Sequence, residues 1–330
     1  MRIAAVAAYI MNKLTKKLLA RFPSLFNNEE LRILDAVIHE KYFKPAPRYL
    51  EQSHFAYWER QPLSWEQAAC PVRPSRGDGQ IYRDFLGRCK RKNRILVLGS
   101  TPEIRDLVAE GGSAKVYVAD FSYSMPAAML KFTSNVDPMR EVWIRDNWLE
   151  LALPPNFFDV ILGDVVLHQV TPAHERAFLS KISSLLRDDG SFITRLFFLD
   201  EKFLRSKLRD ITAEVLAGPF TQREKLTLLK LQTVWLFADL KNRKFDRRRS
   251  AREFGDLIRE GGMQDPILQS VNAALIADRD SYREWSPPGE EELVRIVSSA
   301  FVTTDRRGAH DYRYAEYFPI FSLTPKRGIS

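Results

Sequence analysis

Cysteine, glycine and long apolar runs are all scarce in this sequence. Its 330 residues include only two cysteines, Cys70 and Cys89, which excludes a disulfide framework and a zinc site built on several cysteines. Only 15 glycines and 18 prolines are present, so a collagen-like or low-complexity chain is excluded as well. No apolar run approaches the roughly 20 residues that a membrane-spanning helix needs. We therefore expect a reduced, cytoplasmic protein without a membrane span.

Histidine is also too sparse to suggest a metal centre. The chain has five, at His39, His54, His168, His174 and His310. The two that lie nearest in sequence, His168 and His174, are too far apart to form a helical i, i+4 metal pair. No metal site is expected.

The N-terminus has one apolar stretch, residues 3–11, preceded by a single arginine. Such a stretch could begin a signal peptide, but Lys13, Lys16 and Lys17 follow it instead of a small-residue cleavage site. An amphipathic first helix is the better interpretation.

Positive charge is in excess, with 50 Lys and Arg against 42 Asp and Glu and a net charge of +8. A basic chain can bind nucleic acid or a membrane surface. The tightest basic cluster comprises Arg243, Lys244, Arg247, Arg248, Arg249 and Arg252. No aromatic residues alternate with these charges as in an RNA-binding segment, which favours a solvated helix face. A small-molecule partner is expected in place of nucleic acid.

A hydrophobic content of 45% and a charged content of 28% are typical of a globular chain with a sizeable core. The length suits two domains, or one large domain with additions. Composition and periodicity change along the chain and predict four segments. They are a helical N-terminal lid or extension at 1–92, a cofactor-binding core at 93–199, a helical insert capping the substrate site at 200–295, and the last two strands of the core sheet at 296–330.

Short apolar runs alternate with helical patterns in the second segment, which predicts an α/β fold with a parallel sheet and helices on both faces. The expected strands are 94–98, 115–119, 140–144, 159–162 and 191–198. The expected helices between them are 103–109, 124–131 and 172–186. Residues 200–295 read as helices without a clear strand, and two late strands are expected at 301–304 and 312–324, joined by a turn at Gly308.

The residues that follow each strand carry the functional signal, because ligands of open α/β sheets bind beyond the carboxyl ends of the strands. A glycine there allows close approach of a ligand, and a carboxylate can accept two bonds from a ribose diol. In strand order these residues are Gly99, Asp120, Asp146-Asn147-Trp148 and Gly163-Asp164. Each of these residues, taken alone, is equally consistent with a turn or a helix cap. Their joint order along the chain is more informative.

Taken together, these motifs resemble those of class I S-adenosylmethionine-dependent methyltransferases over residues 94–200. The resemblance implies a Rossmann-like, seven-stranded, mostly parallel sheet with an antiparallel last strand. The matching elements are Leu98-Gly99 for the first motif, Asp120 for the ribose, Asp146-Asn147-Trp148 for the adenine, 158–164 for the fourth strand and 185–190 for the turn before strand five. By the same resemblance the cofactor is S-adenosylmethionine, bound by Gly99, Thr101, Glu103, Asp120, Phe121, Asp146, Asn147, Trp148 and Asp164.

The first motif departs from the family pattern of three glycines, since Gly99 is followed by Ser100, Thr101 and Pro102. A nicotinamide dinucleotide needs the glycine-rich turn for its pyrophosphate. The departure therefore argues against that cofactor and fits a ligand without phosphate.

Catalysis by such a protein is mainly positioning, because a sulfonium methyl is already activated. His168 is the candidate general base, and the alternative is a capping or packing histidine. Asp164 is expected to contact the cofactor's amino group or the substrate, or to stabilise the turn. Arg195 either pairs with a carboxylate or faces outward from its strand.

Three aromatic residues complete the candidate site. Tyr57 and Trp58 belong either to a lid, where an aromatic face favours a sulfonium, or to a local core. Tyr57 and Tyr123 are the alternative proton acceptors.

The predicted activity is in-line methyl transfer to an oxygen or nitrogen nucleophile of a small molecule. Asn-Pro-Pro-Tyr or Asp-Pro-Pro-Tyr is absent after strand four, which argues against methylation of exocyclic base amines. Two alternatives remain open. The first is transfer or cyclisation of the aminocarboxypropyl arm, and the second is a non-catalytic binding protein.

Overall fold

The computed structural model describes residues 65–121, 124–280 and 285–326. Their main feature is a seven-stranded sheet of order β3-β2-β1-β4-β5-β9-β8. The strands are β1 (Arg94–Leu98), β2 (Lys115–Asp120), β3 (Glu141–Arg145), β4 (Phe158–Asp164), β5 (Leu186–Arg195), β8 (Phe301–Arg307) and β9 (Ile320–Pro325). β1 to β5 are parallel, and β9 pairs antiparallel with both β5 and β8. The Rossmann-like, mostly parallel sheet predicted from the sequence is confirmed.

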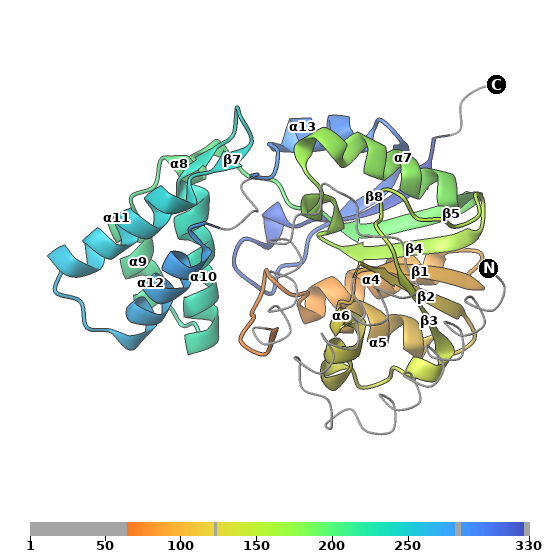
Figure 1. Cartoon of the computed structure of the whole chain (residues 1–330), viewed down its shortest axis with the longest axis horizontal. Helices are drawn as coiled ribbons and strands as arrows, with labels where there is room; N and C mark the ends of the chain where they lie inside the picture. The colour runs from red at the N-terminus through yellow and green to blue at the C-terminus, as the bar shows by residue number, and fades with distance from the viewer. Residues whose placement is uncertain (1–64, 122–123, 281–284, 327–330) are drawn as a thin grey trace, which may run out of the picture.

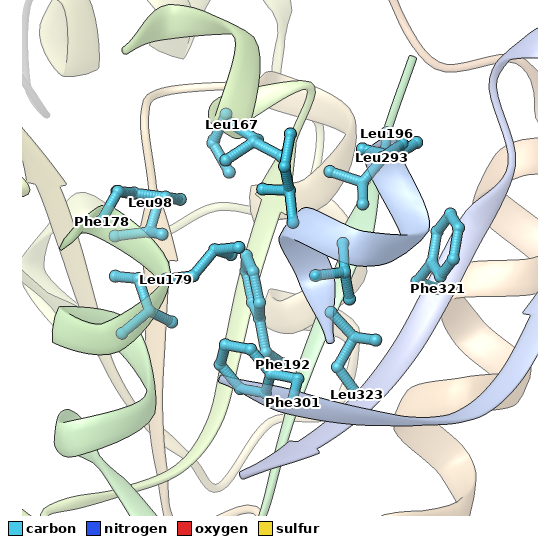
Figure 2. Close-up of a cluster of buried hydrophobic side chains, with 14 of the residues drawn as sticks. Leu98, Leu167, Phe178, Leu179, Phe192, Leu196, Leu293, Phe301, Phe321 and Leu323 are labelled. Carbon is cyan, nitrogen blue, oxygen red and sulfur yellow. The ribbon is translucent and has the colours of Figure 1, made fainter. Parts of the chain in front are cut away.

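The central strands are apolar on both faces, which is why their sequences are continuous hydrophobic runs. Side chains of β1 alternate between two cores. Leu96 and Leu98 belong to one apolar cluster, while Ile95 and Val97 belong to another on the opposite face. Figure 2 shows the first of these clusters, where Leu98 lies beside Phe178.

Helices cover both faces of the sheet (Figure 1). α4 (Arg76–Arg88), α5 (Pro102–Glu110) and α6 (Ser124–Ala128) lie on one side, and α7 (Glu175–Leu185) and α13 (Glu290–Val297) lie on the other. α4 begins at a capping box, in which the Ser75 hydroxyl accepts from the Asp78 amide and the Asp78 carboxylate accepts from the Ser75 amide.

A block of helices stands beside the sheet between β5 and α13 (Figure 1). It contains α8 (Glu201–Leu204), α9 (Leu208–Ala217), α10 (Gln222–Leu236), α11 (Arg247–Glu260) and α12 (Pro266–Asp278). The block has an apolar core of its own, which includes Leu229, Phe254 and Val271. The expectation of no strand here needs a correction: β6 (Ala238–Asp239) and β7 (Lys244–Phe245) form a short antiparallel ribbon between α10 and α11.

Two predicted strand boundaries are also wrong. The expected turn at 185–190 is largely strand, because β5 begins at Leu186 and pairs with Phe158 before a register shift. Conversely, β9 begins only at Ile320. Residues Ala315–Tyr317 before it form a short 3₁₀ helix.

Most of the basic cluster lies on α11, where three of its arginines pair with exposed carboxylates. Arg248 contacts Asp280, while Arg249 and Arg252 contact Glu253. This is the arrangement of a solvated, ion-paired helix face.

Arg243 precedes the helix, is 7% exposed and binds the buried Glu175, so the expected solvated face does not extend to it. In the described part of the chain, no helix has the length and apolarity to cross a membrane.

Candidate functional site

The strand order brings the predicted site residues to one edge of the sheet. β2, β1, β4 and β5 are neighbours, so their carboxyl ends lie side by side. In register, Leu98 of β1 stands between Ala119 and Gly163, and Asp164 stands beside Arg195. The turn after β1 is therefore flanked by Asp120 on one side and Asp164 on the other.

Gly99 forms that turn with a φ of +78°, a left-handed conformation that favours glycine. Its amide donates to the Ala119 carbonyl at 2.9 Å. A Cβ at this position would lie 3.7 Å from the Trp148 ring. Pro102 then begins α5, and the Thr101 side chain makes no capping bond to that helix. The turn thus brings the N-terminal amides of α5, which the Thr101 side chain does not cap, to the edge of the sheet.

Asp120 ends β2 and is 5% exposed. Its carboxylate accepts the Ser100 hydroxyl at 2.7 Å, which joins the end of β2 to the turn after β1. The next residue, Phe121, is half-buried, and its carbonyl accepts from Arg145 Nε at 2.8 Å. Asp120 and Phe121 therefore stand at the position predicted for a ribose site.

The loop after β3 is organised by Asp146. Its carboxylate accepts from the amides of Asn147 at 2.9 Å and Ala152 at 3.1 Å. Asn147 Oδ1 accepts from the Leu149 amide, whereas Asn147 Nδ2 is buried without a partner among the described residues. The Trp148 indole donates to the Ala119 carbonyl at 2.9 Å. The loop is therefore held against β2 and the Gly99 turn.

An ion pair that sequence analysis missed lies at the start of α5. Arg73 Nε donates to Glu103 Oε1 at 2.7 Å, while Glu103 Oε2 is buried and has no partner in the described part of the chain. Glu103 was expected to bind the cofactor, but nothing in the sequence connected it with Arg73.

Arg195 is the centre of a buried cluster of charges. Its guanidinium binds both oxygens of Asp164, at 2.7 and 3.0 Å, and one oxygen of Asp78 at 2.9 Å. It also donates to the Pro71 carbonyl and contacts the Tyr312 hydroxyl. The interpretation of Arg195 as an outward-facing strand residue is wrong, because the side chain is fully buried between carboxylates of the chain itself.

Burial governs the titration of this cluster. It raises the pKa of Asp164 to about 6, although Arg195 acts to lower it, and the charges of Asp78 and Glu103 raise it further. The nearby carboxylates hold the pKa of Arg195 above its ordinary value in spite of its burial. Burial also raises the pKa of the Tyr312 phenol.

Tyr82 completes the cluster from α4. Its hydroxyl donates to the Gly163 carbonyl at 2.7 Å and accepts from the Arg195 amide at 2.8 Å. Tyr82 and Asp78 come from a segment that the sequence marked only as helical. The one available signal was the Ser75–Asp78 capping box, which predicts a helix start and no site.

His168 lies in the 3₁₀ turn Val166–Gln169 after β4 and is 3% exposed. Its Nε2 accepts from the Phe197 amide at 2.7 Å, so Nε2 is unprotonated and its lone pair is already engaged. A general base needs that lone pair for the substrate proton. The geometry therefore favours the packing interpretation of His168 over the general-base interpretation.

Three predicted residues, Tyr57, Trp58 and Tyr123, lie outside the described residues. Within the residues that are described, no group of three or more His, Cys, Asp or Glu side chains could hold a metal ion.

Comparison with known proteins gives similarity of fold only. No family model and no curated protein matches the sequence. Among solved structures, a protein of Rhodobacter sphaeroides described as a candidate zinc-dependent alcohol dehydrogenase is 17% identical, with a TM-score of 0.51 over 83% of this chain and 99% of its own. The 1,6-didemethyltoxoflavin-N1-methyltransferase of Burkholderia thailandensis, crystallised with S-adenosylhomocysteine, is 15% identical, with a TM-score of 0.46 over 86% of this chain and 94% of its own.

A third structure is the N-methyltransferase NodS of Bradyrhizobium japonicum, in complex with S-adenosylhomocysteine. It is 10% identical, with a TM-score of 0.42 over 84% of this chain and 99% of its own. Because these sequence identities are so low, the comparisons show similarity of fold only. The activity has to be inferred from the residues of the site. By its strand order and its antiparallel last pair, the chain has a seven-stranded, Rossmann-like fold.

Proposed function

We propose that this chain is an S-adenosylmethionine-dependent methyltransferase that acts on an oxygen or nitrogen nucleophile of a small molecule. The observation that carries the proposal is the row of polar residues along one edge of the sheet. Asp120, the Gly99 turn and Asp164 end or follow the neighbouring strands β2, β1 and β4. Such a row suits a ligand that lies across the carboxyl ends of these strands.

The residues present fit this cofactor. Two buried polar atoms near the row, Glu103 Oε2 and Asn147 Nδ2, have no partner among the described residues. A buried polar group without a hydrogen bond costs about 1–3 kcal/mol, so both positions favour a ligand. The cofactor offers an ammonium group to the first and a ring nitrogen to the second.

Each part of the cofactor then has a residue to hold it. Asp120 accepts the ribose hydroxyls, while Asp146 and Asn147 contact the adenine edge beside the half-buried Trp148 ring. The amino-acid end would be held at the Gly99 turn and the start of α5, with Glu103 binding the ammonium and its ion-pair partner Arg73 beside the carboxylate. The cofactor supplies an electrophilic methyl group, and the chain contributes positioning and exclusion of water.

Calorimetry with S-adenosylmethionine tests the assignment. Asp120→Ala should weaken binding at least tenfold, because hydrogen bonds to a carboxylate contribute about 1.5–3 kcal/mol each. Glu150→Ala, which removes an exposed carboxylate from the loop after β3, is the matched control and should bind normally. Unchanged affinity in a folded Asp120→Ala protein would refute the ribose assignment.

Product analysis then separates methyl transfer from the alternative activities. S-adenosylhomocysteine is the expected product of methyl transfer. Methylthioadenosine would show transfer or cyclisation of the aminocarboxypropyl arm. Failure of the wild-type protein to bind S-adenosylmethionine would refute both activities and favour the non-catalytic alternative.

A further inference from the structure

Residues 65–75, which we call the strap, run along the edge of the sheet at the candidate site. The Pro71 carbonyl accepts from Arg195 at the end of β5 at 2.9 Å. Two residues later, Arg73 donates to Glu103 in the first turn of α5 at 2.7 Å. β5, β4 and β1 are neighbours in the sheet, and α5 follows β1. The strap therefore spans the carboxyl ends of these three strands.

The strap is also attached to the helical block. The Ala69 amide donates to the Thr227 hydroxyl of α10 at 3.3 Å, in a buried hydrogen bond. In Figure 1 the strap is the orange segment between the helical block and α4. It thus ties the helical block to the edge of the sheet at the candidate site.

Two buried polar atoms at the strap have no hydrogen-bond partner in the described part of the chain. One is a donor, Trp65 Nε1, and the other is an acceptor, Glu103 Oε2. Arg73 contacts both residues, because its guanidinium carbon lies 5.7 Å from the centroid of the Trp65 ring and its Nε donates to Glu103. A donor and an acceptor that are buried near one another and left unsatisfied favour a ligand that carries the complementary pair.

We propose that the amino-acid end of the cofactor holds the strap closed, with its ammonium on Glu103 and its carboxylate on the Trp65 indole N–H beside Arg73. The inference rests on the proposed function, since it concerns the same ligand. An α-amino acid group is a zwitterion, so it offers a cationic donor and an anionic acceptor on neighbouring atoms. Bonds from such charged groups are stronger than bonds between neutral groups. The carboxylate is then the part of the ligand that binds the strap.

Three nucleosides separate the parts of the ligand in calorimetry. They are S-adenosylmethionine, its decarboxylated form, and methylthioadenosine, which lacks the whole amino-acid end. Trp65→Phe keeps an aromatic ring and removes only the N–H donor. It should weaken S-adenosylmethionine about tenfold and change the affinity of the decarboxylated form by less than about twofold. Equal losses for the two ligands, or no loss for either, would overturn the inference.

A second variant tests the ammonium half of the assignment. Glu103→Gln should weaken S-adenosylmethionine and its decarboxylated form alike, because both carry the ammonium, and should leave methylthioadenosine unchanged. The control is Trp143→Phe, which removes an indole N–H that donates to Glu141 at the start of β3. This variant should leave the ratios among the three nucleosides as they are in the wild type.

Amide hydrogen exchange of the wild-type protein measures closure without any substitution. Saturation with S-adenosylmethionine should slow exchange in residues 65–75 about threefold or more, because opening of the strap then breaks bonds to the ligand. Saturation with methylthioadenosine should leave exchange in the strap unchanged. Equal protection by the two ligands, or none by either, would contradict closure by the amino-acid end.

The outcomes keep the strap and the proposed function apart. If the wild-type protein bound none of the three nucleosides, the proposed function would be refuted and the strap with it. If it bound all three, and neither Trp65→Phe nor hydrogen exchange distinguished ligands with and without the carboxylate, the cofactor site would be retained and the strap refuted.

Discussion

The guanidinium of Arg195 joins four segments of the chain at one point. It binds Asp78 of α4, Asp164 of β4, the Pro71 carbonyl and the Tyr312 hydroxyl. A buried pair contributes little over an apolar replacement of both partners, but removal of one partner leaves a buried charge. Arg195 is therefore more important to stability than its place at a strand end suggests.

Arg195→Met should destabilise the protein by about 3–5 kcal/mol, because two carboxylates would remain buried without their cation. Urea denaturation measures the change. Arg88→Met, which removes the arginine of the exposed pair with Asp305, should stay within about 0.5 kcal/mol of wild type. Similar losses in the two variants would contradict the central role of Arg195.

The raised pKa of Asp164 predicts a pH dependence of stability. The folded value of about 6 lies above the ordinary value of 3.8, so the folded state binds this proton more tightly than the unfolded chain does. The resulting stabilisation is complete below about pH 4 and is lost as the pH rises through about 6.

Asp164→Asn should remove this dependence. Melting temperatures of the wild type and the variant, measured at intervals from pH 4 to pH 7.5, should therefore differ in slope. The wild type should lose stability relative to the variant as the pH rises. A constant difference over the whole range would show that Asp164 titrates normally.

At the scale of elements, the turn after β4 is unusually tight. Val165 has a φ of +54°, which is rare for a β-branched residue. A Cβ at Gly163 would lie 2.8 Å from the methyl groups of Val166. The glycine is therefore required by packing within the turn.

Gly163→Ala should cost about 1–3 kcal/mol, the usual range for an overpacked core. Combined with Val166→Ala, which removes the clashing methyl groups, it should cost clearly less than the sum of the two single changes. A double-mutant cycle by urea denaturation measures this coupling. If the two losses in the free energy of unfolding simply added, the contact between residues 163 and 166 would not be the cause of the cost.

The same turn carries His168, which links it to the residues after β5. His168→Leu would leave the Phe197 amide buried without an acceptor and should cost about 1–3 kcal/mol. Turnover per folded molecule should remain close to that of wild type. A 10²–10⁴-fold loss of turnover at unchanged stability would restore the general-base interpretation.

At the scale of the whole molecule, Arg243 connects the helical block to the helices over the sheet. It lies between β6 and β7 and binds Glu175 of α7 through two bonds, at 2.6 and 3.0 Å. It also contacts Glu292 of α13 and the Ser286 carbonyl. Burial raises the pKa of Glu175, and Arg243 acts against that rise.

Arg243→Ala should loosen this connection, because it leaves Glu175 buried without its cation. Amide hydrogen exchange should become faster in α10 and α11 than in β1 and β4. Arg259→Ala, which breaks an exposed pair with Asp256 on α11, is the control and should change neither region. If amide hydrogen exchange became faster by the same factor in the strands and in the helical block, Arg243 would act on global stability only.

The sequence by itself determined the α/β class, the parallel strands and the row of polar residues that follows them. Continuous apolar runs predict strands buried on both faces, and each polar residue is found at its strand end in the chain. These features depend on local pattern, so a single sequence is enough to predict them. Asp120, Asp146 and Asp164 were found in this way.

Only the tertiary structure decided which charged side chains form ion pairs. Asp78 and Arg195 are 117 residues apart in the chain, and Arg73 and Glu103 lie on different segments, so no local pattern connects either pair. The same holds for His168, whose hydrogen bond to the Phe197 amide depends on how the ends of β4 and β5 pack together. Burial and long-range pairing set the charge balance of this site, and both arise only when distant segments fold against one sheet edge.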